Sequence, residues 1–247
     1  MKLATWNLER LGYAKRRREA GPIVAHMKAI DADVWVLTET VEDICPGAGY
    51  VGVSTTGTDR DQWPDEVWTK IWSRWPVEAV LKTSDPARCV AARILHPQRG
   101  PFIVYGTVLP WTTDKWRGLP GAGGVAFRGA LDEQASDWAA LRARFPGEDL
   151  FVMGDFNQQL GVGSPWYYGS KVNERHLGES LARLGLAAFT GGDNDPVRRG
   201  SKDLACIDHI CGPDLRVSQV RLTTRWPDVP KPVDGLSDHF GVAVELD

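Results

Sequence analysis

The sequence lacks both a long hydrophobic run and an excess of charge of one sign. Its longest apolar stretches have the length of strands, far short of the roughly 20 residues that a membrane-spanning helix requires. The formal net charge is −3, whereas proteins that grip long nucleic acid by its backbone usually present a basic face. The composition therefore predicts no membrane association. It argues against tight nonspecific DNA binding, although it stays compatible with a local basic groove.

Cysteine is scarce as well, with only Cys45, Cys89, Cys206 and Cys211. In one strand, the odd spacing of Cys206 and Cys211 would point them to opposite faces, which makes a poor disulfide or shared metal pair. We therefore expect four reduced cysteines, as in a cytoplasmic protein. Met1 and Lys2 lead directly into an apolar run that reads as a strand, so we expect no signal peptide.

The chain has 247 residues and contains no repeat, low-complexity tract or linker. This length fits one large two-layer domain, with two small domains as the alternative. We predict a single domain over residues 1–247.

Period-2 alternation and short apolar runs predict strands, and apolar residues at helical spacing predict three helices. The predicted strands span residues 2–6, 33–38, 66–73, 77–82, 89–95, 102–109, 150–153, 186–189, 204–211, 215–224 and 239–246. The predicted helices begin near Pro22, Gly129 and Asn173 and end near Ile30, Phe145 and Leu184. Because the many strands and few helices do not alternate strictly, we predict an α+β fold with two packed sheets inside and helices outside.

Five short polar clusters lie at the ends of these apolar runs. They are Trp6-Asn7, Glu39, Gly154-Asp155-Phe156-Asn157, Ile207-Asp208-His209 and Ser237-Asp238-His239. An Asp or Asn after a single strand is usually a turn residue. Together, however, the clusters supply two amides, four carboxylates and two histidines, which contain the set that metal-assisted hydrolysis of a phosphate ester requires.

Glu39 ends the run Val34-Trp35-Val36-Leu37-Thr38. A carboxylate at the edge of a buried strand must be paired, hydrated or bound to a metal. Mg²⁺ takes oxygen ligands and keeps several waters, so one or two carboxylates suffice to hold it. We predict Glu39 as the principal metal ligand. Asn7 would orient Glu39, approach the metal, or donate to a phosphate oxygen.

Asp155 and Asn157 follow the apolar run Leu150-Phe151-Val152-Met153. Their i, i+2 spacing lets both side chains face one side. Asp155 could then activate water as a general base, and Asn157 could stabilise a developing oxyanion as a neutral donor. An Asx turn after the strand is the alternative for both residues.

A histidine near a phosphodiester can accept a proton from water or donate to the transition state. We predict this role for His239, with Asp208 behind it to fix its tautomer, because a buried aspartate between Ile207 and Ile210 needs a partner. His209 should face the opposite side of its strand and is interpreted as structural.

The order of these clusters resembles the endonuclease/exonuclease/phosphatase superfamily, which includes pancreatic-type DNases, abasic-site endonucleases, sphingomyelinases, inositol polyphosphate 5-phosphatases and deadenylases. The resemblance spans residues 7 to 239. It implies a four-layer α/β/β/α sandwich of mostly antiparallel sheets, and hydrolysis of a phosphate ester with Mg²⁺ or Mn²⁺. It also implies Asn7, Glu39 and Asp238 on the metal side, and Asp155, Asn157, Asp208 and His239 in catalysis.

Two departures from the family pattern concern the substrate. Val108 and Trp111 occupy positions where many members carry polar phosphate contacts, and no Lys follows Glu39 as in abasic-site endonucleases. Charge for the phosphate could instead come from a loop that carries Arg198, Arg199 and Lys202, although a solvated loop is the alternative. Trp111 and Trp116, in Gly/Pro-rich loops, could stack on a nucleotide base.

We therefore predict a metal-dependent phosphodiesterase or nuclease acting on a phosphate ester such as DNA or RNA, with no obligate protein partner. The alternative within the superfamily is a small-molecule or lipid-headgroup phosphatase. A non-catalytic binding domain that keeps the fold would have lost a site residue. However, the sequence retains all of them: Glu39, Asp155, Asp208, Asp238 and His239.

Overall fold

Two six-stranded sheets pack face to face in the computed structural model, which describes residues 1–10, 20–56, 65–161, 168–200, 204–229 and 236–247. The first sheet has the order β11-β12-β1-β2-β4-β3. Its strands are β1 (Lys2–Asn7), β2 (Val34–Val41), β3 (Val51–Ser54), β4 (Glu66–Ser73), β11 (Val220–Trp226) and β12 (Gly241–Leu246). Only β1 and β2 pair in parallel among the described strands of this sheet.

The second sheet has the order β5-β6-β7-β8-β10-β9. Its strands are β5 (Val77–Leu81), β6 (Val90–His96), β7 (Gly100–Val108), β8 (Leu150–Asp155), β9 (Leu186–Ala188) and β10 (Asp208–Pro213). Strands β7 and β8 are parallel, and the remaining described pairs are antiparallel. The mostly antiparallel character of both sheets is thus confirmed.

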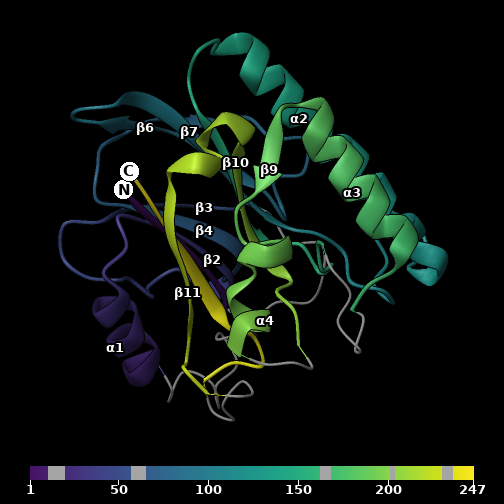
Figure 1. The fold of residues 1–247 in the computed structure, drawn as a ribbon, viewed down its shortest axis with the longest axis horizontal. Coiled ribbons are helices and arrows are strands. Elements are labelled where there is room, and N and C mark those ends of the chain that lie inside the picture. The colour runs from purple at the N-terminus through teal and green to yellow at the C-terminus, as the bar shows by residue number, and fades with distance from the viewer. Residues whose placement is uncertain (11–19, 57–64, 162–167, 201–203, 230–235) are drawn as a thin grey trace.

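Helices cover the outer faces of both sheets (Figure 1). They are α1 (Ala20–Ile30), α2 (Val125–Arg144) and α3 (Lys171–Arg183). The short α4 (Pro196–Gly200) lies against β11, and its Val197 joins the core between the sheets. Ile23 and Met27 of α1 pack on Trp6 and Trp35 of the first sheet. In Figure 1, α2 and α3 lie on the opposite side of the molecule, where they cover the second sheet. This arrangement confirms the predicted four-layer sandwich.

The alternation of side chains explains why the central strands are apolar throughout. Val34 and Val36 face the core between the sheets, whereas Trp35 and Leu37 face α1. A strand buried on both faces reads as a continuous apolar run. All four cysteines are free, and Cys206 and Cys211 belong to the cores on opposite faces of the second sheet.

Several predicted boundaries were wrong. Asp208 is the first residue of β10, so residues 204–207 of the predicted strand 204–211 lie outside it, and residues 238 and 239 precede β12. Residues 214–219 form a 3₁₀ helix, since the alternating Leu215 and Val217 are 68% and 39% exposed and do not face a core. Strand β3 and helix α4 were not predicted because they are short, and β3 is a poorly buried edge strand.

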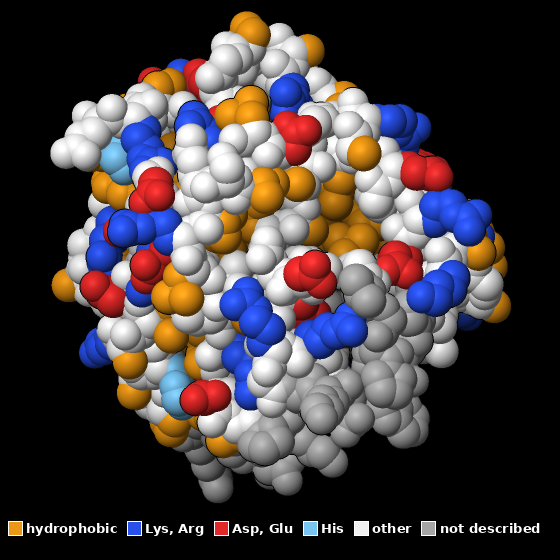
Figure 2. Space-filling view, in the orientation of Figure 1, with side chains coloured by type: hydrophobic (Ala, Val, Ile, Leu, Met, Phe, Trp, Pro, Cys, Tyr) orange, Lys and Arg blue, Asp and Glu red, His pale blue; other side chains and the backbone are white. Residues whose placement is uncertain are grey.

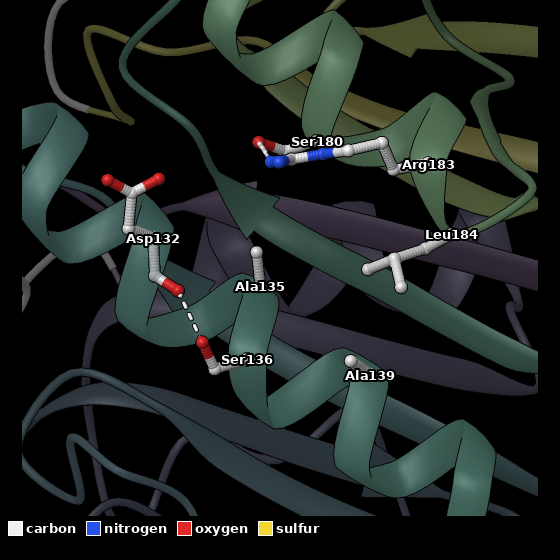
Figure 3. Close-up of a pocket in the computed structure, with 7 residues that line it drawn as sticks. All are labelled: Asp132, Ala135, Ser136, Ala139, Ser180, Arg183 and Leu184. Carbon is white, nitrogen blue, oxygen red and sulfur yellow. Dashed lines mark hydrogen bonds between the residues drawn. The ribbon is translucent and has the colours of Figure 1, made fainter.

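The outer helical layer carries a groove of about 370 Å³ between α2 and α3 (Figure 3). Its lining residues are Asp132, Ala135, Ser136, Ala139, Ser180, Arg183 and Leu184. The polar groups in it bond to one another, since the Ser136 hydroxyl donates to Asp132 O at 2.9 Å and Arg183 donates to Ser180 Oγ at 3.1 Å. None of the predicted site residues is among them. No helix in the described part of the chain combines the length and apolarity needed to span a bilayer.

Candidate active site

The predicted site residues gather at one end of the core between the sheets. Asn7 is the last residue of β1, Asp155 is the last of β8, and Asp208 is the first of β10. Each continues the inward-facing set of its strand, as Leu3, Met153 and Ile210 do within the core. Asp155 and Asp208 are directly opposite each other in the pairing of β8 with β10. The sheet register therefore brings polar side chains together where the apolar core ends.

Asn7 connects the two sheets. Its side-chain Nδ2 donates to Asp155 Oδ2 at 2.9 Å and lies 3.5 Å from Glu39 Oε1. Its Oδ1 accepts the backbone N–H of Glu9 at 2.7 Å. The side chain is buried, so these bonds satisfy the amide where water does not reach it.

Asp155 is held by three N–H donors. The backbone N–H of Asn157 donates to its Oδ1 at 2.8 Å, and the amides of Asn157 and Asn7 each donate to its Oδ2 at 2.9 Å. Burial raises the pKa of Asp155 to about 8, and the charge of Asp208 adds to this rise, while His239 and the N–H donor of Asn157 oppose it. A ligand that binds Asp155 in its ionised form must therefore offset the free-energy cost of burying that charge.

Both amide hydrogens of Asn157 are engaged within the protein. Its Nδ2 donates to Leu109 O at 3.0 Å as well as to Asp155, and its Oδ1 accepts the hydroxyl of Tyr168 at 3.0 Å. The backbone of Asn157 is left-handed, with a φ of 48°. To act as the predicted oxyanion donor, Asn157 would have to exchange one of these bonds for a substrate oxygen.

His239 pairs with Asp208, as predicted. Its Nδ1 lies 2.6 Å from Asp208 Oδ2, and its Nε2 lies 3.8 Å from Asp238 Oδ1. Burial alone would lower the pKa of His239, but the nearby carboxylates of Asp208 and Asp155 outweigh it and raise the pKa well above its ordinary value. The carboxylates around the imidazole thus favour its protonated form.

Hydrogen bonds to Trp6 and Asn7 of β1 hold the segment that carries His239. Ser237 Oγ donates to Asn7 O at 2.7 Å and accepts the backbone N–H of His239 at 3.0 Å. The indole of Trp6 donates to His239 O at 3.2 Å. These bonds explain how residues more than 230 positions apart in sequence hold one site.

Two sets of side chains could hold a cation. Ligand atoms of Asp155, Asp208 and His239 lie within 4.8 Å of one another. Asp208 Oδ1 is buried and has no hydrogen-bond partner among the described residues, so a cation would satisfy it. The second set is the one predicted from sequence. There Glu39 has a left-handed φ of 49° and contacts Asn7, and Asp238 is exposed at the rim.

Sequence reasoning missed Glu9 and Tyr168. Glu9 Oε2 accepts the backbone N–H of Asp238 at 3.0 Å, and the Glu9 backbone bonds to Asn7, so Glu9 links two predicted metal-side residues. Its i, i+2 spacing from Asn7 was an available signal. Tyr168 reaches the site from the segment before α3. No strand leads to it, so its sequence position carried no comparable signal.

The predicted substrate-binding residues differ in how the structure holds them. Trp111 is half-buried with its ring 6.4 Å from that of Trp68. Arg199 donates to Asn194 O at 2.8 Å and to Thr223, which fixes it to the protein surface. Arg198 lies beside it in α4, and Lys202 is outside the described residues.

Trp116 and His209 are interior residues held by hydrogen bonds within the protein. The stacking role suggested for Trp116 is wrong, because this residue is buried with its indole bonded to Asp85 at 2.7 Å. His209 is fully buried on the other face of β10, 3.0 Å from Gln158 O and 3.2 Å from Thr190 Oγ1. Burial lowers its pKa to about 4, so it stays neutral, in keeping with a structural role.

A model of the endonuclease/exonuclease/phosphatase family matches residues 4–239. The chain belongs to this family. Its members are phosphoesterase hydrolases, and the chain is an enzyme of that class. No curated protein matches the sequence.

Solved structures share the fold at low sequence identity. A 3′-5′ exonuclease from Neisseria meningitidis is 20% identical with a TM-score of 0.68, and the match covers 100% of both chains. A 3′ phosphatase from Neisseria bound to a product DNA hairpin is 18% identical with a TM-score of 0.65, over 100% of this chain and 99% of that one. An AP endonuclease from Archaeoglobus fulgidus is 16% identical with a TM-score of 0.71, again over 100% and 99%.

Proposed function

We propose that this family member is a divalent-metal-dependent phosphodiesterase, built as one catalytic domain over residues 1–247. The observation that carries the proposal is the 2.6 Å contact between His239 Nδ1 and Asp208 Oδ2. This contact fixes the orientation of the imidazole and leaves Nε2 as the ring nitrogen for the substrate, as in other base–orienter pairs. Asp155 stands beside this pair at the end of β8.

In this proposal His239 donates a proton and Asp155 accepts one. Asp208 and Asp155 raise the pKa of His239, which favours the imidazolium as a donor to a phosphate oxygen. Asp155, oriented by three N–H donors, is then the group best placed to accept a proton from the attacking water. Asn7 keeps Asp155 and Glu39 in fixed relation across the two sheets.

The donor set fits a hard cation such as Mg²⁺ or Mn²⁺, which takes oxygen ligands. Glu39, Asn7 and Asp238 would hold it on the metal side. Asp208 Oδ1 is buried and has no hydrogen-bond partner among the described residues, so a cation there would satisfy it. When bound, the ion would stabilise charge on the phosphate oxygens or on the leaving group.

An activity panel tests this function. The protein is assayed with Mg²⁺ or Mn²⁺ on plasmid DNA, single-stranded DNA, RNA, abasic duplex, bis-p-nitrophenyl phosphate and p-nitrophenyl phosphate. We expect cleavage of at least one phosphodiester, and loss of that activity in His239→Ala. Hydrolysis of the monoester alone would overturn the phosphodiesterase proposal.

A phosphomonoesterase is the second candidate. The face in Figure 2 intersperses Lys and Arg with Asp and Glu, and it does not gather a single basic patch. Together with the net charge of −3, this favours a small phosphate ester over a long nucleic acid. Ionic strength separates the two, because KM for a nucleic acid rises steeply with salt and KM for a small ester much less.

A further inference from the structure

Tyr168 presents a phenol to the candidate active site from outside both sheets. Its hydroxyl donates to Asn157 Oδ1 at 3.0 Å, while 43% of the residue stays exposed. The carboxylates of Asp155, Asp238, Asp208 and Glu39 are near enough that, after burial, they help to raise its pKa to about 12. The phenol is therefore protonated at neutral pH and is a hydrogen-bond donor among carboxylates.

The position of Tyr168 is built by two buried glutamines. Its backbone N–H donates to Gln159 Oε1 at 3.2 Å, and its carbonyl accepts from Gln158 Nε2 at 3.3 Å. Gly169, with a φ of 90°, lies so close to the Gln158 side chain that a Cβ would clash with it. Ser170, which caps α3, donates its N–H to Gln158 Oε1 at 2.8 Å. Buried side chains thus fix the backbone from which the phenol extends.

The other neutral donors of the site are already engaged. The Asn157 amide donates to Leu109 O and Asp155, and the Asn7 amide donates to Asp155 and contacts Glu39. Losing either bond to Asp155 would leave a buried carboxylate oxygen with one donor fewer. The Tyr168 hydroxyl, in contrast, donates to the neutral Asn157 Oδ1 and belongs to a residue that is 43% exposed, so it can turn its hydrogen to a ligand without removing a donor from a carboxylate.

We propose that the Tyr168 hydroxyl binds a non-bridging phosphate oxygen of the substrate, with Asn157 Oδ1 holding its hydrogen when the substrate is absent. This inference rests on the proposed function, since it assumes that a phosphate ester occupies the site. It makes Tyr168 a substrate-binding residue alongside His239, and it places the phosphate between the segment before α3 and the loop before β12.

The first test is Tyr168→Phe, which removes only the hydroxyl. We expect kcat/KM for bis-p-nitrophenyl phosphate to fall roughly 10- to 100-fold, the size of a lost hydrogen bond to a charged group. Affinity for inorganic phosphate, measured by calorimetry with Mg²⁺ present, should fall at least roughly 5-fold. Tyr50→Phe is the matched control, because that phenol bonds to Ala32 O beneath the first sheet, and it should leave both quantities unchanged.

A double-mutant cycle separates phosphate binding from mere support of Asn157. Asn157→Gly suits the left-handed backbone and removes the amide. If Tyr168 contacts phosphate, adding Tyr168→Phe to Asn157→Gly weakens phosphate binding further. If the second change has no effect in that background, Tyr168 acts only through Asn157 and the inference is overturned.

Failure of this inference and failure of the proposed function give different results. If the wild type turns over substrate and Tyr168→Phe has the same kinetics and phosphate affinity, the role of Tyr168 is overturned and the proposed function stands. Phosphate binding that depends on Tyr168, without hydrolysis of any ester, overturns the function and supports the phosphate contact. A wild-type protein that neither binds phosphate nor hydrolyses any ester overturns both.

Discussion

Asn7 Nδ2 lies 2.9 Å from Asp155 Oδ2 and joins the end of β1 in one sheet to the end of β8 in the other. The site is therefore a property of the sandwich and not of either sheet alone. Any change in how the sheets pack would move the metal-side residues relative to Asp155.

Replacing this amide should affect both activity and stability. In Asn7→Ala, the buried Asp155 loses one of three donors, so we expect kcat to fall roughly 10- to 100-fold and the free energy of unfolding to fall by about 1–2 kcal/mol. Steady-state kinetics and urea unfolding measure the two effects. Thr5→Val is the control, because the Thr5 hydroxyl is buried two residues earlier with no hydrogen-bond partner in the described residues. Equal kinetics in Asn7→Ala and wild type would contradict the bridging role.

Neutralising Asp208 should change the titration of His239. In Asp208→Asn the shape is kept, but the nearest charge that raises the pKa of His239 is lost, so this pKa should fall. Histidine NMR signals followed against pH measure it, and turnover should drop by roughly 100-fold or more because the tautomer is no longer fixed. An unchanged His239 titration would show that Asp208 does not control the imidazole.

The metal prediction can be tested without turnover. Mg²⁺ or Mn²⁺ should raise the melting temperature of wild-type protein, because an ion that binds only the folded state stabilises it. Glu39→Gln should shrink this shift and abolish hydrolysis, and EDTA should reverse both effects. Glu179→Gln on the exposed surface of α3 serves as the charge-matched control. A full metal-induced shift in Glu39→Gln would remove Glu39 from the ligand set.

The buried His209 should make the free energy of unfolding fall at acid pH. Its pKa is lowered from 6.5 to about 4 in the folded protein, so below pH 6.5 the unfolded chain binds a proton that the folded chain does not. The stability it contributes is fully present above pH 6.5 and is lost as pH falls toward 4, by up to about 3 kcal/mol. Unfolding free energies of wild type and His209→Gln, compared between pH 7 and 4, isolate this effect. Parallel curves for the two proteins would contradict it.

Much of the fold could be predicted because strands buried on both faces have an unambiguous apolar signal. Val34–Leu37 and Phe151–Met153 are examples, and the polar residues that follow them mark where the core ends. The Asp208–His239 contact was predictable because a buried aspartate requires a partner. By contrast, the exposed edge strand β3 and the 3₁₀ helix over residues 214–219 are not set by burial, so periodicity misled there.

Tyr168 was missed for a different reason. It is positioned by side-chain bonds to Gln158 and Gln159, which form only in the folded protein and leave no periodic pattern in the sequence. Trp116 was misread for the opposite reason. A tryptophan in a Gly/Pro-rich loop suggested a ring free to stack on a base, but its indole donates a hydrogen bond to Asp85.

The direct pairing of Asp155 with Asp208 across β8 and β10 has a consequence for the history and engineering of this protein. Like charges on opposed strand positions destabilise a sheet, and burial makes this worse. Replacing one of these carboxylates with an amide would relieve this repulsion, but it would also disturb the bonds that Asp155 accepts from Asn7 and Asn157 or the contact of Asp208 with His239. A laboratory selection for heat resistance would act on this balance and not on turnover, so thermostable variants of this chain should be screened for activity at every round.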